Sequence, residues 1–301
     1  MKPVLVAFGV LALAGCQSSG AEPDDSYDTR IDQPAYAAGE GPLVLIDEAH
    51  HNVHRATHTY RPFAELLRSD GYRVERHRDR FEAAALDGAG LLVIANALGT
   101  NDRNDDPAMS DAEAHAVIAW VRNGGALLLI TDHYPTGAAV ANLAARLGVD
   151  MSGGVTEDSA HHDPRFDPSH IVFDSLPRHP ATEGVGRVLT FTGQSLGVPP
   201  GAIALLPLRP SARDRAARPR VERDGSAVRV HVEYGPPQPA AGRAQAVALT
   251  LGAGRVAVLA EAALATAQLS AYDGSRFGMN VDGYDNRRFV VNLVHWLTRH
   301  E

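Results

Sequence analysis

The stretch Leu43-Val44-Leu45-Ile46-Asp47-Glu48-Ala49-His50-His51-Asn52 decides the fold of this chain. Its first four residues form an uninterrupted apolar run, which is typical of a strand buried on both faces in a parallel sheet. The polar residues that follow would then stand at the carboxyl end of that strand. Because ligands of open parallel sheets bind in the crevice outside those ends, the stretch predicts both an α/β fold and the place of its functional site.

Similar apolar runs recur along the first half of the chain and alternate with helical patterns. This alternation predicts a mostly parallel, flavodoxin-like sheet flanked by helices. Ser110 and Glu113 make a capping box that marks the start of one helix. Strands are expected at 43–46, 72–75, 91–94, 126–130 and 255–259, and helices from Pro62 to Gly71, after Ser110, and over 136–147.

The second half is less regular and predicts an antiparallel β extension to the sheet. Strands are expected there at 188–192, 202–206, 227–233 and 244–251. We expect the Arg-rich segment 209–223 to be a solvated loop, because it mixes Arg with Asp and Glu. Asp285 or Asn286 is expected to cap a last helix that carries Phe289 to Leu297.

The N-terminus has the layout of a secretory signal. The 11 residues from Val4 to Ala14 are apolar except for Gly9, too short a run to span a bilayer. Leu13-Ala14-Gly15-Cys16 resembles the lipobox of bacterial lipoproteins, and this resemblance implies a lipid such as palmitate on Cys16. Gln17 after the cysteine suggests, by the same resemblance, an outer-membrane lipoprotein that faces the periplasm. The expected organisation is a signal peptide at 1–15, a flexible tether at 16–42 and one domain at 43–301.

Composition limits the chemistry of the domain. The net charge of −8 argues against a nucleic-acid partner, which would require a basic face. Cys16 is the only cysteine, so neither an intramolecular disulfide nor a thiol nucleophile is available beyond the anchor. The expected partners are therefore the membrane, through Cys16, and a small polar ligand.

Polar residues follow four of the expected strands at or near their ends. If these strands are neighbours in a parallel sheet, Asp47, Asn96, Asp132-His133 and Glu261 meet at one edge. Each residue alone could instead cap the next turn, since Asp and Asn favour such positions. The predicted ligand-binding residues are Asp47, Glu48, His51, Asn52, Asn96, Gln194 and Asn280.

The same edge offers groups that bind zinc or manganese. Asp, Glu and His side chains are competent ligands, although no His-Glu-x-x-His spacing occurs. The expectation of a divalent metal therefore rests on the types of side chain at this edge and not on a known motif. The predicted ligands are Asp47, His50, Asp132, His133 and Glu261.

Several segments together resemble the class I glutamine amidotransferase-like superfamily. They are Val121-Arg122-Asn123-Gly124-Gly125 before a strand, His179-Pro180 before Gly184, the stretch from Asp47 to Asn52, Gly254-Arg255-Val256 leading to Glu261, and Asp285 to Leu297. The last three resemble more closely an uncharacterised branch of that superfamily found in cell-envelope proteins. Amidotransferases of the superfamily use a cysteine after a central strand. The corresponding point here is Thr131-Asp132-His133, so the resemblance implies no glutaminase activity, because an Asp cannot form the thioester.

Two functions follow from these patterns, with Asp132 and His133 as the candidate catalytic residues. The first is a cell-envelope lipoprotein that binds a small, saccharide-like polar ligand at the carboxyl ends of the strands. The second is a metal-dependent hydrolase that uses the Asp/His/Glu group at the same edge. A vestigial edge on an interaction scaffold is the remaining alternative.

Overall fold

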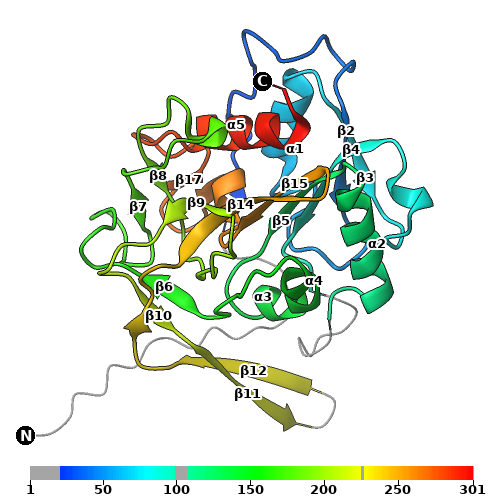
Figure 1. The fold of residues 1–301 in the computed structure, drawn as a ribbon. Helices are drawn as coiled ribbons and strands as arrows, with labels where there is room; N and C mark the ends of the chain where they lie inside the picture. The colour runs from blue at the N-terminus through cyan, green and yellow to red at the C-terminus, as the bar shows by residue number, and fades with distance from the viewer. Residues whose placement is uncertain (1–20, 99–106, 225–226, 301) are drawn as a thin grey trace, which may run out of the picture.

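The computed structural model describes residues 21–98, 107–224 and 227–300 (Figure 1). The predicted signal peptide and the lipidation site Cys16 lie outside these residues. Within the described part of the chain, no helix is both long enough and apolar enough to cross a membrane.

A seven-stranded sheet forms the centre of the fold, in the strand order β3-β2-β4-β5-β15-β14-β9. The first five strands in this order are mutually parallel, whereas β14 runs antiparallel to both β15 and β9. The predicted α/β class, with a mostly parallel sheet and antiparallel additions in the second half, is confirmed. The strands are β2 (Leu43–Asp47), β3 (Arg73–His77), β4 (Ala89–Ala95), β5 (Ala126–Ile130), β9 (Ile203–Pro207), β14 (Ala244–Leu251) and β15 (Gly254–Leu259).

Helices cover both faces of this sheet (Figure 1). Successive strand residues point to opposite faces, so each strand contributes to two apolar layers. Ile46, Val93 and Ile130 pack with α1 (Arg61–Ser69) and α5 (Asn286–Thr298). The opposite layer contains Leu45, Leu92 and Leu129 and packs with α2 (Asp111–Arg122), α3 (Thr136–Ala139) and α4 (Ala141–Arg146).

Local sequence signals explain where these helices begin and end. The predicted capping box is present: Ser110 Oγ accepts from the N–H of Glu113 at 3.2 Å, and the Glu113 carboxylate accepts from the N–H of Ser110 at 2.9 Å. The single helix expected over 136–147 is instead two short helices that break at Val140. The carbonyl of Ala139 accepts from the N–H of Ala108 at 2.6 Å, and this contact from another segment takes a group that a continuous helix would use internally.

Among the described residues, smaller sheets and three short 3₁₀ helices complete the fold. A two-stranded hairpin of β11 and β12 extends away from the central sheet (Figure 1). The small strands are β1 (Ala21–Pro23), β6 (Val155–Glu157), β7 (Val172–Phe173), β8 (Val188–Leu189), β10 (Arg213–Arg215), β11 (Ala217–Asp224), β12 (Ala227–Tyr234), β13 (Gln238–Pro239), β16 (Ala267–Ser270) and β17 (Arg276–Gly278), and the 3₁₀ helices are η1 (Ala84–Leu86), η2 (Pro180–Thr182) and η3 (Ala263–Ala265).

Two local expectations were wrong. Segment 209–223 is not a solvated loop, because β10 pairs with β6 and β11 pairs with β12 over most of it. Its alternating side chains have a strand period that the charged composition hides. Neither Asp285 nor Asn286 caps α5 through its side chain: Asp285 accepts from the N–H groups of Gly186 and Arg187, and Asn286 bonds the backbone of Leu189.

The described part of the expected tether is also folded onto the domain. β1 adds to β16 as an antiparallel strand, and Asp24 accepts a hydrogen bond from Asn280 at 3.0 Å. Further along, the N–H of Ala35 donates to Asp70 at 2.8 Å, and Tyr36 packs edge-on against Tyr72. The low apolar content predicted disorder, but these hydrogen bonds and one aromatic contact hold residues 21–42 in place.

Candidate functional site

The sheet order places four polar strand ends side by side. β2, β4, β5 and β15 are consecutive parallel neighbours, so Asp47, Asn96, Asp132 and Glu261 follow strands that end at the same edge. This adjacency is what the apolar runs predicted. Two separate polar clusters form along the edge, one around Asp132 and Glu261 and one around Asp47.

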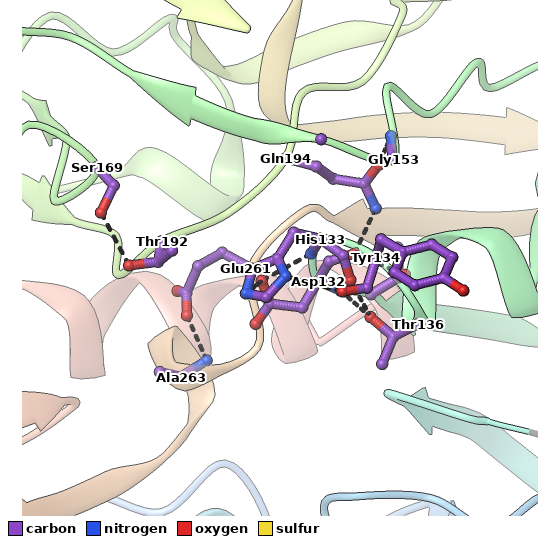
Figure 2. A network of polar contacts seen from close by, with 12 residues as sticks. Asp132, His133, Tyr134, Thr136, Gly153, Ser169, Thr192, Gln194, Glu261 and Ala263 are labelled. Carbon is purple, nitrogen blue, oxygen red and sulfur yellow. Dashed lines mark hydrogen bonds and ion pairs between the residues drawn. The ribbon is translucent and has the colours of Figure 1, made fainter. Parts of the chain in front are cut away.

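Asp132 occupies the centre of the first cluster (Figure 2). Its side chain is 20% exposed, and its Oδ1 accepts from the backbone N–H of His133 at 2.8 Å. The backbone N–H of Asp132 donates to Thr136 Oγ1 at 2.9 Å, which fixes the turn after β5. Its carboxylate also accepts from the backbone N–H of Ala262 and from the Asn96 amide, so Asp132 is held in one orientation with its side chain partly exposed.

Glu261 lies beside Asp132 and is almost fully buried, with 1% exposure. Its carboxylate accepts from the backbone N–H groups of Ala263 and Leu264, the second at 2.8 Å, at the start of η3. These contacts make Glu261 the group that orders the turn after β15. Its depth leaves it without direct access to a ligand.

The two carboxylates influence each other's protonation. Burial raises the pKa of Glu261 well above its usual value, and the nearby charge of Asp132 raises it further. Burial also raises the pKa of Asp132, while the His133 imidazole and the amide of Asn96 oppose that rise. Since like charges this close are unfavourable in a buried site, Glu261 holds the proton and Asp132 is the carboxylate more easily ionised.

His133 is the most accessible side chain of this cluster, at 34% exposure. Its Nδ1 bonds the carbonyl of Tyr134 at 3.0 Å, and its Nε2 stands 3.8 Å from Asp132 Oδ1. The ring is thus held at Nδ1, which donates to that carbonyl, so Nε2 of the neutral ring is an acceptor. Asp132 and His133 together present a carboxylate and a ring nitrogen at the surface of the edge.

Asn96 contributes a buried amide to the same cluster. Its backbone has a φ of 45°, in the left-handed region that Asn tolerates better than most residues. Its side-chain amide bonds Asp132, whereas its Oδ1 is buried with no hydrogen-bond partner among the described residues. An unpaired buried acceptor is costly and calls for an explanation at a candidate site.

The segment 190–196 closes the cluster from the other side (Figure 2). Gln194 spans two elements, donating from Nε2 to the carbonyl of Asp132 at 2.7 Å and accepting at Oε1 from Gly153 at 2.8 Å. Gly193 is required by space, because a Cβ there would meet the carbonyl oxygen of Ala260 at 2.7 Å. Gln194 therefore positions the turn that carries Asp132 and His133, and both polar atoms of its amide are engaged in these contacts.

The second cluster centres on His50, which bridges two carboxylates. Its Nδ1 is 2.9 Å from Asp47 Oδ1, and its Nε2 is 3.2 Å from Glu113 Oε1. Burial alone would lower the pKa of His50, but the two carboxylates outweigh it and the net shift is upward. Burial would likewise raise the pKa of Glu113, yet hydrogen bonds from Ser110 and His50 lower it to about 2. The cluster clamps the loop after β2 to the start of α2.

The remaining predicted ligand-binding residues divide between the edge and other parts of the fold. Asn52 donates to Asp47 at 3.0 Å and belongs to the clamp. Glu48 pairs with Arg76 at 2.6 Å and is only 3% exposed. His51 is exposed with a φ of 51°. Asn280 donates to Asp24 and to the carbonyl of Gln268.

The structure does not gather the five predicted metal ligands into one group. Asp47 and His50 bond each other in the clamp, whereas Asp132, His133 and Glu261 belong to the other cluster. Across the described residues, no three or more His, Cys, Asp or Glu side chains are placed to hold a metal ion. Sequence could show only that ligand types end on neighbouring strands, not the direction in which each side chain turns.

Two tyrosines near the Asp132 cluster were missed by the sequence analysis. Tyr60 is fully buried and donates to the carbonyl of Ala262 at 2.9 Å, which fixes the turn next to Glu261. Tyr234, at the end of β12, is 40% exposed; burial of part of its ring and the charge of Asp132 raise its pKa. No spacing linked either residue to this edge, because the contacts join segments far apart in the chain.

Comparisons with known proteins support the fold. No protein-family model and no curated protein matches the sequence. The N-terminal domain of mmIFT52 is similar in structure, with a TM-score of 0.59 at 14% identity over 85% of this chain and 97% of that chain. A protein from Bacteroides uniformis described as ThuA-like matches at a TM-score of 0.43 and 15% identity, covering 89% and 93% of the two chains. A cytoplasmic protein from Salmonella typhimurium matches at 0.47 and 13%, covering 85% and 98%. The first likeness shows a shared α/β fold and nothing about activity.

Proposed function

We propose that this protein binds a small hydroxyl-rich ligand, of the saccharide type, at the edge formed by Asp132 and His133. The observation that carries the proposal is the partly exposed side chain of Asp132 beside a partly exposed imidazole, both held by backbone contacts. A fixed acceptor next to a fixed ring nitrogen suits the paired hydroxyl groups of a sugar. Because both groups are already oriented, binding loses little side-chain entropy.

Asn96 supports Asp132 from below the surface. Its Oδ1 is a buried acceptor without a partner among the described residues, next to the carboxylate that its amide bonds. Because this oxygen is shielded from solvent, Asn96 would orient Asp132 and would not itself contact the ligand.

Binding is better supported than catalysis by the position of the second carboxylate. A general acid must reach the atom it protonates within hydrogen-bond distance. Glu261 carries the proton of the pair, but it is buried and commits its oxygens to the N–H groups of Ala263 and Leu264. Glu261 would therefore tune and support Asp132, and it would not act on a substrate.

The metal-dependent hydrolase is the weaker alternative. It needs about three protein ligands around one ion, whereas the candidate ligands are shared between two clusters. Stoichiometric zinc or manganese in the purified protein, with loss of metal in Asp132→Ala, would favour this alternative over saccharide binding.

A melting-temperature screen against mono- and oligosaccharides tests the binding proposal. We expect at least one sugar to raise the melting temperature of the purified protein, and Asp132→Ala to abolish that rise. Asp132→Asn keeps the shape and one acceptor oxygen, so it should retain a smaller rise. Asp87→Ala, which removes an exposed carboxylate elsewhere, should respond like the wild type. No sugar effect, or an equal effect in Asp132→Ala, would contradict the proposal.

We also propose that the protein is lipid-anchored through Cys16 at the outer membrane and faces the periplasm. The lipobox-like run before Cys16 supports this location. Cells grown with labelled palmitate should label the wild type, and Cys16→Ser should be unlabelled and leave the membrane fraction. Equal labelling or an unchanged membrane fraction in Cys16→Ser would overturn the anchor.

A further inference from the structure

A second candidate site lies outside the Asp132 cluster, in a surface pocket of about 510 Å³. Four segments line it: the loop around His161 and His162, the segment of Val172 and Asp174, Arg187 beside β8, and the turn at Tyr284. None of Asp132, His133 and Glu261 contributes to it. We propose that this pocket binds a small acidic molecule, whose carboxylate or phosphoryl group is held by Arg187.

The acidic groups at the pocket wall are already satisfied by partners. Asp163 is buried and accepts from Arg165 at 2.7 Å and from the Tyr284 hydroxyl at 2.6 Å. Asp174 pairs with Arg209, a cation that approaches from outside the pocket. Because each of these two carboxylates is paired with a cation, its repulsion of an incoming anion is reduced.

The third acidic group is Asp282, which faces Arg276 at 3.6 Å. It is 81% exposed, so water screens most of its charge. Asp285, next to the pocket, accepts from the backbone N–H groups of Gly186 and Arg187 and not from the guanidinium. The acidic residues near this pocket thus each have a partner other than the Arg187 side chain.

Arg187 is the cation that remains. Its guanidinium lies 4.3 Å from the ring centroid of Tyr284 and forms no ion pair with a carboxylate among the described residues. Stacking on the ring and a side-chain hydrogen bond with Tyr284 hold the guanidinium plane, and the other N–H groups of the fork can donate to a ligand. Tyr284 is itself fixed by its bond to Asp163, so the guanidinium is held in place before any ligand arrives.

Two histidines also lie at the same wall. His161 is tied to Asp158 at 3.2 Å and to Ser211 at 3.1 Å through Nδ1, which leaves its Nε2 for another partner. His162 lines the pocket and is half-buried. The planar guanidinium fork of Arg187 matches the oxygens of a carboxylate or phosphate group. The pocket is open to solvent, so a small hydrophilic anion can reach it.

Isothermal titration calorimetry with inorganic phosphate and with succinate, at constant ionic strength, tests the pocket and distinguishes phosphoryl from carboxylate recognition. We expect saturable binding of at least one of the two anions. Arg187→Ala should weaken it by about tenfold or more, the effect of losing a charge-assisted hydrogen bond. Arg220→Ala removes an exposed cation of the hairpin and should bind like the wild type.

Two further variants keep the test decisive. Arg187→Lys keeps the charge but lacks the planar fork, so it should bind the anion more weakly than the wild type. This variant can be measured if Arg187→Ala does not fold. Asp132→Ala should bind the anion normally, which separates this site from the saccharide proposal. Saturable binding of neither anion, or wild-type affinity in both Arg187 variants, would overturn the inference.

Discussion

Removing the His50 imidazole should destabilise the protein more than any exposed substitution would. The side chain is 6% exposed and joins Asp47, which is fully buried, to Glu113, which is 9% exposed. His50→Ala leaves two carboxylates facing each other without the cation between them. Breaking a buried ion pair from one side costs about 3–5 kcal/mol. We expect the lower end of this range, because Asn52 and Ser110 still bond the two carboxylates.

Urea unfolding followed by circular dichroism at pH 6 measures this loss. His58→Ala is the matched control, because its side chain is 53% exposed and lies 3.8 Å from Glu22. The control should change the free energy of unfolding by no more than about 0.5 kcal/mol. A loss below about 1 kcal/mol in His50→Ala would refute the argument that His50 holds a buried charge cluster together.

The effect of His50 should also depend on pH, in a direction that its environment fixes. Its pKa is raised in the folded protein, so its contribution is complete below about pH 6.5 and is lost as the pH rises through the folded pKa. His50→Gln, which cannot carry the charge, should therefore differ most from the wild type near pH 6 and less at higher pH. A difference that grows with rising pH would contradict the cationic clamp.

Three further substitutions test other parts of the fold. The pKa of Glu113 is lowered to about 2, so its ionised carboxylate stabilises the fold above about pH 4.5, and the wild type loses this stability as the pH falls towards 2. Glu113→Gln should lack this contribution. If the free energy of unfolding falls equally with acid in both proteins, the hydrogen bonds of Glu113 do not stabilise the fold. The pKa of Glu261 is raised, so the wild type should lose stability as the pH rises above about 4.5. In Glu261→Gln, the free energy of unfolding in urea should depend less on pH over this range. A stronger dependence on pH in the variant would contradict the raised pKa. Gly254→Ala would place a Cβ 2.0 Å from the carbonyl oxygen of Val121, so we expect a loss of about 1–3 kcal/mol, and a stability equal to the wild type would show that α2 can move away.

The parallel strands of the central sheet were within reach of sequence reasoning because their signals are local. Each apolar run marks a strand, each helix between two runs favours a parallel crossover, and the polar residue after the run marks the carboxyl end. That the strands before Asp47, Asp132 and Glu261 lie close together in the sheet was a condition of the reasoning, and the structure shows this order. The capping box at Ser110 was equally readable, since it depends on residues only three apart.

The division of the edge into two clusters could not be read from sequence. It depends on Glu113 at the start of α2, which bonds His50, so that His50 does not join the Asp132 cluster. It also depends on Glu261 turning to the backbone of η3 instead of facing outward. The folded course of 21–42 was missed for a similar reason, because its order comes from contacts with distant residues such as Asp70 and not from its own composition.

Ring-nitrogen NMR of His133 tests the central claim most directly. With the protein ¹⁵N-labelled at histidine and the His133 signals assigned by His133→Gln, the sugar found by the melting screen is added to saturation. We predict that the His133 nitrogens shift while those of exposed His58 do not, and that Asp132→Ala abolishes the shift. A bound sugar that leaves the His133 signals unchanged would contradict the account, because binding would then occur away from the Asp132–His133 edge.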